Sequence, residues 1–301
     1  MLYILALFTP DIEYVVANIY IQYLRKCFPA VRNQVSFHYT YPVDHPIRIE
    51  QQEETIKIGL PNDLMEILSA LESPDSELSC EMTPKEFADK LLRHTTSEKS
   101  YRSWRVSLEY PQNLLRNVAK SGCQTTYTML PDIDMIPNKD MDLQLEKFLL
   151  TKQPPHCLAP SSPKSKVKTN KCAFVVPVYE ISRQVEHLPK DKNELLGLLK
   201  NKLSRPFHSA LFSINQKASQ LKLWEAMKPN VSSQNKESSS TLKTTTSGIP
   251  MDEIDVGYKV DKYQFKYEPL YVAKADTPIF DERFIGFGMT RNTQVCLVPV
   301  L

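Results

Sequence analysis

The chain has 301 residues, 42% of them hydrophobic, and 37 Lys and Arg against 35 Asp and Glu give it a net charge of +2. This length and composition indicate a globular protein with a buried core and exclude a fibrous or wholly disordered chain. The small net charge gives no sign of a surface built for nucleic acid, so we expect no nucleic-acid partner. With seven glycines and neither GxGxxG nor GxxxxGK[ST], the chain also lacks the Gly-rich phosphate loops of dinucleotide-binding and P-loop proteins.

The cysteines and one sequon bear on the cellular compartment. Six cysteines without CxxC spacing do not indicate a zinc site, and they allow one or two disulfides whose pairing the sequence does not determine. A glycosylation sequon at Asn230 favours the secretory pathway. The apolar opening, residues 2–8, is shorter than the roughly 20 residues of a membrane helix and lacks a basic flank and a cleavage site, so we expect neither anchor nor signal within this chain.

The first 41 residues predict a β-α-β unit. Residues 2–8 form a continuous apolar run typical of a buried strand, and Asp11 can cap the helix that follows. Apolar residues keep one helical face as far as Cys27, and Pro29 ends the pattern. An alternating strand over 35–41 completes the unit, which is typical of a parallel sheet covered by helices.

Further elements follow in the same α/β manner. We expect helices over 84–94 and within 110–122, with Gly122 as the stop of the second helix. Apolar strands are expected over 125–130 and 173–181. Residues 153–171 and 229–247 are rich in Pro, Ser, Thr and Lys, and we interpret them as flexible insertions within one catalytic domain spanning 1–301.

A pair of aspartates stands directly after the strand predicted over 125–130. Asp132 and Asp134 are two residues apart, so in an extended segment their side chains point the same way and can converge on one divalent cation. In open α/β sheets, ligands gather beyond the carboxyl ends of strands, where this pair would lie. A DxD triplet alone is more often a solvated turn, but the apolar strand before it favours a functional metal site.

Several ordered blocks carry a more specific resemblance. YPQNLLRNVAKSG, DIDMIPN, VVPVYEISR, KNELLGLL, RPFH and YEPLYVAKADTPIFDERFIGFGMTRNTQ follow one another from Tyr110 to Gln294. In sequence and order they resemble glycosyltransferase family 49. The resemblance implies a GT-A fold, with a central and mostly parallel sheet flanked by helices. It also implies Mn²⁺-dependent, inverting transfer of glucuronate from UDP-glucuronic acid to a xylose-terminated O-mannosyl-type glycan.

The resemblance also implies roles for particular residues near the donor. Asp132 and Asp134 would hold the metal that bridges the donor diphosphate and stabilises the UDP leaving group. Asn113, Arg116 and Asn117 on the preceding helix are candidates for donor contacts. An ordinary solvated helix face explains these three residues equally well.

An inverting transfer needs a general base for the acceptor hydroxyl, and our candidates are Asp281 and Glu282. In the alternative interpretation, Asp281 caps a helix while Glu282 or Arg283 forms an internal ion pair. The planar fork of arginine suits a uronate carboxylate, so Arg283 is a donor-binding candidate. The remaining cationic candidates for the same role are Arg116, Arg291 and Lys192.

The residues that bind the acceptor glycan are predicted from less specific sequence features. Trp224, Tyr267 and Glu268 are candidates for an acceptor platform, because flat aromatic faces pack against sugar rings, although core packing explains the aromatic pair as well. His208 in the RPFH block is interpreted as structural. The expected partners are a UDP-sugar, a glycan or glycoprotein acceptor, and other Golgi glycosyltransferases.

The chain departs from the family pattern at both ends. Family members are type II membrane proteins of the Golgi with an anchor, an opening strand near the uridine, and a late histidine that resembles a third metal ligand. Aligned with that pattern, this chain begins at the second strand and stops seven residues after Gln294. We therefore expect the first strand and the final strand-loop segment to be missing. The alternative function is a catalytically inactive family member, or a gene-model fragment, that binds glycan or a partner enzyme in the lumen.

Overall fold

The computed structural model divides into two compact units, which are described separately. Unit 1 comprises Met1–Thr125 and Phe280–Thr290, and unit 2 comprises Thr126–Ile279 and Arg291–Leu301. Within them the structure describes residues 3–9, 11–44, 46, 66–67, 69–71, 80–92, 99–152, 157, 172–227, 254–260, 264–286 and 288–295.

Unit 1 opens with the β-α-β unit that the sequence predicts. Strand β1 (Tyr3–Phe8) leads into helix α1 (Asp11–Cys27), and strand β2 (Val35–Thr40) pairs with β1 in parallel. This prediction is confirmed. Pro29 ends α1 as expected, but it also starts the short helix α2 (Pro29–Gln34), which suits proline because the first turn of a helix needs no N–H partner.

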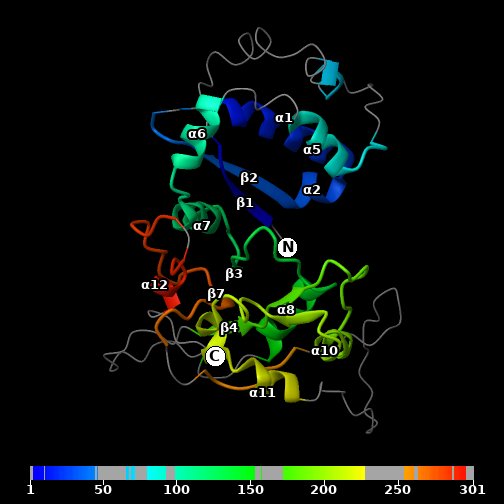
Figure 1. Ribbon diagram of the computed structural model, residues 1–301, viewed down its shortest axis with the longest axis vertical. Helices are drawn as coiled ribbons and strands as arrows, with labels where there is room; N and C mark the ends of the chain where they lie inside the picture. The colour runs from blue at the N-terminus through cyan, green and yellow to red at the C-terminus, as the bar shows by residue number, and fades with distance from the viewer. Residues whose placement is uncertain are drawn as a thin grey trace. The chain divides into compact units, whose positions relative to one another are not determined.

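A hydrophobic cluster in unit 1 joins α1 to helix α5 (Pro84–Leu92), and Figure 1 shows the two helices side by side. Tyr23 stacks on Phe87 with ring centroids 3.9 Å apart, and both side chains are completely buried. A disulfide between Cys27 and Cys80 ties the end of α1 to the segment that leads into α5.

Helices α6 (Lys99–Ser107) and α7 (Gln112–Ser121) follow. The helix predicted within 110–122 is thereby confirmed. Gly122 ends α7 in an ordinary right-handed conformation, so positive φ is not why a glycine stands there. A Cβ at this position would lie 2.9 Å from the His38 ring of β2, so a larger residue here would force the His38 side chain to shift.

The central sheet of unit 2 is antiparallel. Strand β7 (Leu270–Lys274) lies between β3 (Tyr127–Met129) and β4 (Ala173–Val176) and runs opposite to both. The strand predicted over 173–181 breaks at Pro177, and its second half, β5 (Tyr179–Ile181), pairs with β6 (Ser204–Pro206). Among the described strands only β1 and β2 are parallel, so the expected mostly parallel sheet is wrong for this part of the chain.

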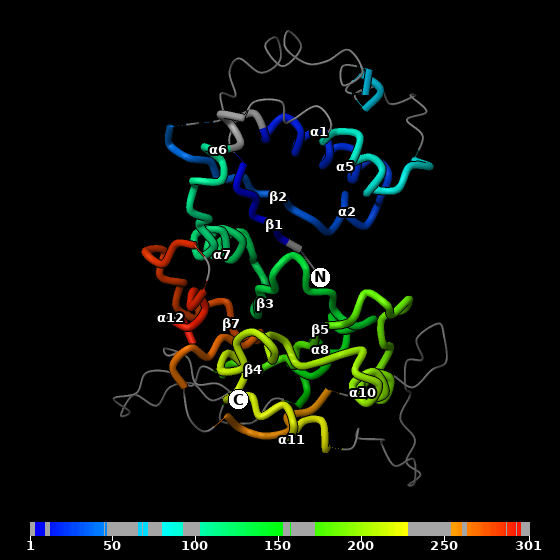
Figure 2. The backbone as a smooth tube through the Cα atoms, in the orientation of Figure 1, coloured from blue at the N-terminus to red at the C-terminus, as the bar shows by residue number. Residues whose placement is uncertain are grey.

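Unit 2 also contains five described helices. They are α8 (Met141–Thr151), α10 (Lys192–Lys200), the 3₁₀ helix η2 (Ser213–Ser219), α11 (Leu221–Ala226) and α12 (Asn292–Val295), which can be followed along the chain in Figure 2. Tyr267 and Tyr271 pack with Ala173 in the core, and a disulfide joins Cys157 to Cys172.

Two predictions lie outside the described residues: the flexible insertions over 153–171 and 229–247, of which only Cys157 is described, and the sequon at Asn230. As to a membrane anchor, the described helices include none with the length and apolar character needed to cross a bilayer.

Candidate functional site

The Asp132–Asp134 pair lies in unit 2, in a turn that begins three residues after β3. The N–H of Met135 donates to the carbonyl oxygen of Asp132 at 3.0 Å, which closes the turn, and Asp134 is exposed within it. The segment is therefore not extended, and the rule that side chains two residues apart share one face of a strand does not apply here. The pair still follows a strand of the sheet, as the sequence predicts.

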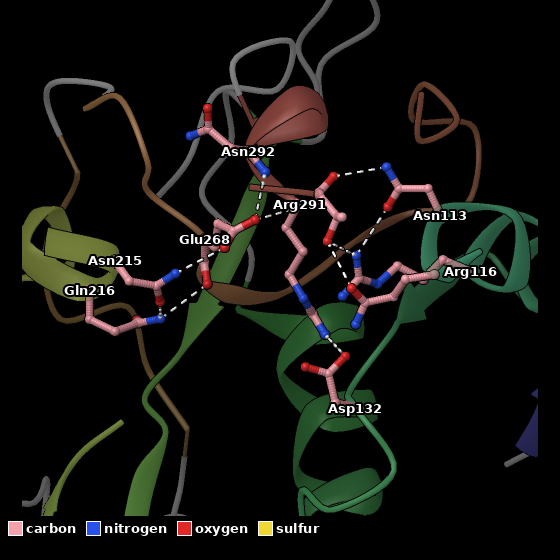
Figure 3. A network of polar contacts seen from close by, with 10 residues as sticks. Asn113, Arg116, Asp132, Asn215, Gln216, Glu268, Arg291 and Asn292 are labelled. Carbon is pink, nitrogen blue, oxygen red and sulfur yellow. Dashed lines mark hydrogen bonds and ion pairs between the residues drawn. The ribbon is translucent and has the colours of Figure 1, made fainter. Parts of the chain in front are cut away.

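Asp132 forms an ion pair with Arg291. Nη2 of Arg291 donates to Oδ1 of Asp132 at 2.7 Å, and Figure 3 shows the arginine side chain extending to this carboxylate. The Arg291 side chain is only 7% exposed, whereas that of Asp132 is 34% exposed. A buried guanidinium and a half-buried aspartate thus neutralise each other at the position predicted to bind metal.

Glu268 holds the backbone from which Arg291 projects. Its Oε1 accepts hydrogen bonds from the N–H groups of Arg291 (2.8 Å) and Asn292 (3.4 Å), at the start of α12. Its Oε2 accepts from Nδ2 of Asn215 at 3.0 Å, and Gln216 Nε2 donates to the Glu268 carbonyl at 3.0 Å. The Glu268 carboxylate therefore has a positioning role within unit 2, and its contact with the acceptor stays a prediction.

The predicted acceptor platform is not present as a solvent-facing surface. Tyr267 is 1% exposed and its hydroxyl lies 2.8 Å from Ser219 Oγ, so core packing is the correct interpretation of this residue. Trp224 is half-buried, with the Tyr179 ring centroid at 5.6 Å and Lys192 Nζ over its ring at 4.3 Å. The Trp224 ring is thus already in contact with neighbours of its own unit.

The polar face of α7 in unit 1 is buried and anchors the segment Phe280–Thr290. Nδ2 of Asn113 donates to the carbonyl oxygens of Asp281 (2.8 Å) and Thr290 (3.1 Å). Nη1 of Arg116 donates to Asn113 Oδ1 at 3.1 Å and to Thr290 Oγ1 at 2.8 Å. The alternative of a solvated helix face is wrong for these two residues, because both side chains are buried in internal hydrogen bonds, and their donor contacts stay a prediction.

Asn117, one turn further along α7, holds Glu282. Its Nδ2 donates to the Phe280 carbonyl at 2.9 Å and to Glu282 Oε1 at 2.8 Å, while its Oδ1 accepts from the Phe280 N–H at 2.9 Å. Asn117 is buried and Glu282 is exposed. The arrangement presents a solvent-facing carboxylate that is fixed at one oxygen by a rigid amide.

Asp281 faces a different neighbour. Arg283 donates from Nη2 to Asp281 Oδ2 at 2.6 Å and from Nε to Oδ1 at 2.9 Å. These hydrogen bonds lower the pKa of Asp281 to about 2. A carboxylate with so low a pKa is a poor proton acceptor near neutral pH, so the geometry favours Glu282 as the base candidate. The predicted ion pair within this segment is present, but Asp281 closes a turn and caps no helix.

The other cationic and imidazole candidates are engaged within unit 2. Lys192 Nζ donates to the carbonyl of Trp224 and, at 2.6 Å, to that of Met227, and burial lowers the pKa of this lysine. It therefore satisfies the carboxyl end of α11. The N–H of His208 donates to Glu180 Oε1 at 2.9 Å, and the residue adopts positive φ at a turn after β6, consistent with a structural role.

The Asp132–Asp134 turn offers two carboxylates to a divalent cation. No group of three or more His, Cys, Asp or Glu side chains within the described ranges is arranged to hold a metal. Two carboxylates nevertheless suit a hard cation that takes its remaining ligands from substrate phosphates and water. The donor chemistry of these two residues thus fits a metal that binds together with a diphosphate, and the metal site stays a prediction.

Two side-chain pairings at the candidate site could not be predicted from the sequence. The pairing of Asp132 with Arg291 joins residues 159 positions apart, and no local pattern signals it. The orienting bond from Asn117 to Glu282 spans 165 positions. Both residues of each pair were named as candidates, but only the fold shows which of them meet.

Comparisons with known proteins agree with the sequence blocks. The profile of glycosyltransferase family 49, described as the glycosyl-transferase for dystroglycan, matches residues 3–301. Beta-1,4-glucuronyltransferase 1 of Danio rerio is 27% identical over 95% of this chain and 53% of its own length, and that of Bos taurus is 30% identical over 72% and 42%. Xylosyl- and glucuronyltransferase LARGE2s of Gallus gallus is 27% identical over 62% of this chain and 20% of its own. The chain thus spans about half the length of the first two relatives.

Proposed function

We propose that this chain, which belongs to glycosyltransferase family 49, transfers glucuronate from UDP-glucuronic acid to a xylose-terminated glycan of the O-mannosyl type. The donor sugar follows from relatives that are named as glucuronyltransferases. The observation that carries the proposal is the Asp132–Asp134 turn, which follows a strand of the central sheet in a chain matched by the family along its length. We also propose that the whole catalytic domain has the GT-A fold that the resemblance implies.

Unit 2 supplies the proposed metal site. Asp132 and Asp134 would hold Mn²⁺, which in such enzymes neutralises the diphosphate as UDP leaves. The chain's own contribution is to place two carboxylate oxygens in one turn and to fix that turn by the Met135–Asp132 hydrogen bond. A third protein ligand is unnecessary where phosphate oxygens complete the coordination.

The proposed general base is Glu282, in the segment that α7 anchors. Glu282 takes the proton of the acceptor hydroxyl while that oxygen attacks the anomeric carbon and the bond to the UDP oxygen breaks, which inverts the anomeric configuration. Asn117 holds one carboxylate oxygen of Glu282 and leaves the carboxylate exposed for the acceptor. Asn117 is thus a positioning residue, and the low pKa of Asp281 makes that carboxylate the weaker candidate for the base.

The disulfides support a location in the secretory pathway. Cys27–Cys80 and Cys157–Cys172 form one bond in each unit, and such bonds persist in oxidising compartments. We propose the Golgi lumen, as the resemblance implies.

A second candidate function rests on the Asp132–Arg291 ion pair. Because Arg291 already neutralises Asp132, the turn is electrostatically stable without any metal. A family member that binds a glycan or a partner enzyme without catalysis would be consistent with this arrangement.

A transfer assay separates the two functions. The chain is incubated with UDP-glucuronic acid and a xylose-terminated acceptor, with Mn²⁺ or with EDTA, and products are identified by mass spectrometry. Mn²⁺-dependent extension of the acceptor by one glucuronate, without extension from UDP-glucose, supports the enzyme. Retention of the acceptor on the protein, without transfer or donor hydrolysis under either condition, supports the non-catalytic function.

A further inference from the structure

Arg291 forms an ion pair with the carboxylate of Asp132, which is a proposed ligand of the metal. Its guanidinium lies 2.7 Å from Oδ1 of Asp132 and is almost completely buried. A monovalent cation of the chain therefore stands at a position where a divalent ion would bind. The question is what happens to this guanidinium when the metal arrives.

The backbone of Arg291 cannot follow a displaced side chain easily. Its N–H is held by Glu268, and the neighbouring Asn292 donates from Nδ2 to the Tyr267 carbonyl at 3.1 Å. Glu268 is fixed in turn by Asn215, which is itself buried. The guanidinium can therefore move only by rotation about the side-chain bonds of Arg291. After its ion pair with Asp132 breaks, the guanidinium stays close to that residue.

Electrostatics make such a state unfavourable unless an anion arrives. A divalent ion bound to Asp132 repels a guanidinium a few ångströms away, and this repulsion is strong in a poorly solvated site. Breaking a buried ion pair also leaves an uncompensated charge. The diphosphate or the uronate carboxylate of a nucleotide-sugar presents paired anionic oxygens, which match the planar fork of arginine.

We propose that Arg291 holds the place of the metal at Asp132 and then binds anionic oxygens of the donor once the metal has displaced it. This inference rests on the proposed function, and it adds a coupling residue to the site. Metal alone binds weakly because it must displace Arg291, and donor alone binds weakly because Arg291 is occupied. Together they bind cooperatively, and linkage requires each to raise the affinity of the other by the same factor.

The test measures Mn²⁺ affinity by electron paramagnetic resonance and UDP affinity by calorimetry, each with and without the other ligand. In wild-type protein we expect each ligand to tighten the other about tenfold. Arg291→Gln should bind Mn²⁺ alone about fivefold more tightly than wild type, and its coupling to UDP should fall to the part that direct coordination of the metal by phosphate supplies. Unchanged Mn²⁺ affinity together with unchanged coupling in Arg291→Gln would overturn the proposal.

Three further variants make the result specific. Arg205→Gln removes another arginine of unit 2 that pairs with a carboxylate, Glu180, and should behave as wild type. Asp132→Asn should weaken Mn²⁺ binding; if it does not, the proposed metal site itself is wrong, independently of Arg291. Arg291→Lys keeps the positive charge but loses the fork, so Mn²⁺ alone should bind as in wild type while coupling to UDP weakens.

Binding measurements with three nucleotides show which anionic group of the donor Arg291 binds. If it binds the diphosphate, Arg291→Gln weakens UDP, UDP-glucose and UDP-glucuronic acid alike; if it binds the uronate, only UDP-glucuronic acid loses affinity. Equal affinity of wild type and Arg291→Gln for all three donors with Mn²⁺ present contradicts the proposal. Thermal unfolding checks that the variants are folded. If none of the Arg291 variants folds, wild type alone still decides, because independent binding of Mn²⁺ and UDP contradicts the mechanism.

Discussion

The polar face of α7 in unit 1 and the Asp132–Arg291 pair in unit 2 are both built from residues of family-like blocks, but they differ in kind. On α7, the Asn113 amide is completely buried and bonded to backbone carbonyls of its own unit. In unit 2, Asp132 remains one-third exposed and forms an ion pair with the charged guanidinium of Arg291. Buried amides bonded to backbone serve the fold, whereas a partly exposed charge pair can exchange one partner for a ligand.

The largest expected effect distinguishes two neighbouring carboxylates, Asp281 and Glu282, in the segment anchored by α7. Glu282→Gln should lower kcat for transfer by about 10³-fold, because it removes the proposed general base. Asp281→Asn should leave kcat within about threefold, because the low pKa of Asp281 makes it a poor base. Steady-state kinetics with saturating donor checks both variants. A larger loss for Asp281→Asn than for Glu282→Gln would reverse the assignment.

The anchoring role of α7 predicts a loss of stability. Asn113→Ala leaves the carbonyls of Asp281 and Thr290 without their amide donor and should lower the free energy of unfolding by about 3 kcal/mol. Urea denaturation followed by circular dichroism measures it. Asn33→Ala, at an exposed position of α2 in the same unit, is the matched control and should change stability by less than about 0.5 kcal/mol. Equal effects of the two variants would show that the amide network is dispensable.

The smallest expected effect concerns pH. The pKa of Asp281 is lowered from 3.8 to about 2 by Arg283, so its ionised form is favoured in the folded state. The resulting stabilisation is present above about pH 4 and is lost as pH falls toward 2. Because the pair is exposed, the effect is small. In Asp281→Asn, the unfolding midpoint should fall less steeply over this interval than in wild type; identical slopes would indicate that the pair does not affect stability.

The sequence predicted those parts of the fold that rest on local patterns. The β-α-β unit of residues 3–40 was predictable because an apolar strand, an amphipathic helix and a second strand follow one another within one short segment. The antiparallel sheet of unit 2 was not, because Tyr127 pairs with Lys274, far along the chain, and no local signal sets that direction. Patterns of two or three residues likewise could not show that Asp132–Asp134 forms a turn.

The same distinction applies to the candidate site. Residue chemistry and the family resemblance proposed Asp132, Glu282 and Asn117 as candidates, because each carries a carboxylate or an amide within the family-like blocks. Their roles depend on burial and on partners that are more than 150 positions away. The sequence therefore predicted a set of polar residues, and only the fold separates those that anchor from those that remain exposed to ligands.

The claim that the Asp132–Asp134 turn is a metal-supported nucleotide site is tested most directly by titrating UDP into wild type and into Asp132→Asn/Asp134→Asn, each with and without Mn²⁺. Asp142→Asn, a carboxylate on α8 of the same unit, serves as the control. The account predicts that the double substitution keeps the fold and weakens Mn²⁺-supported UDP binding at least about tenfold, or about 1.4 kcal/mol, with no change in the control. Equal UDP affinities for wild type and the double variant, with and without Mn²⁺, would contradict it.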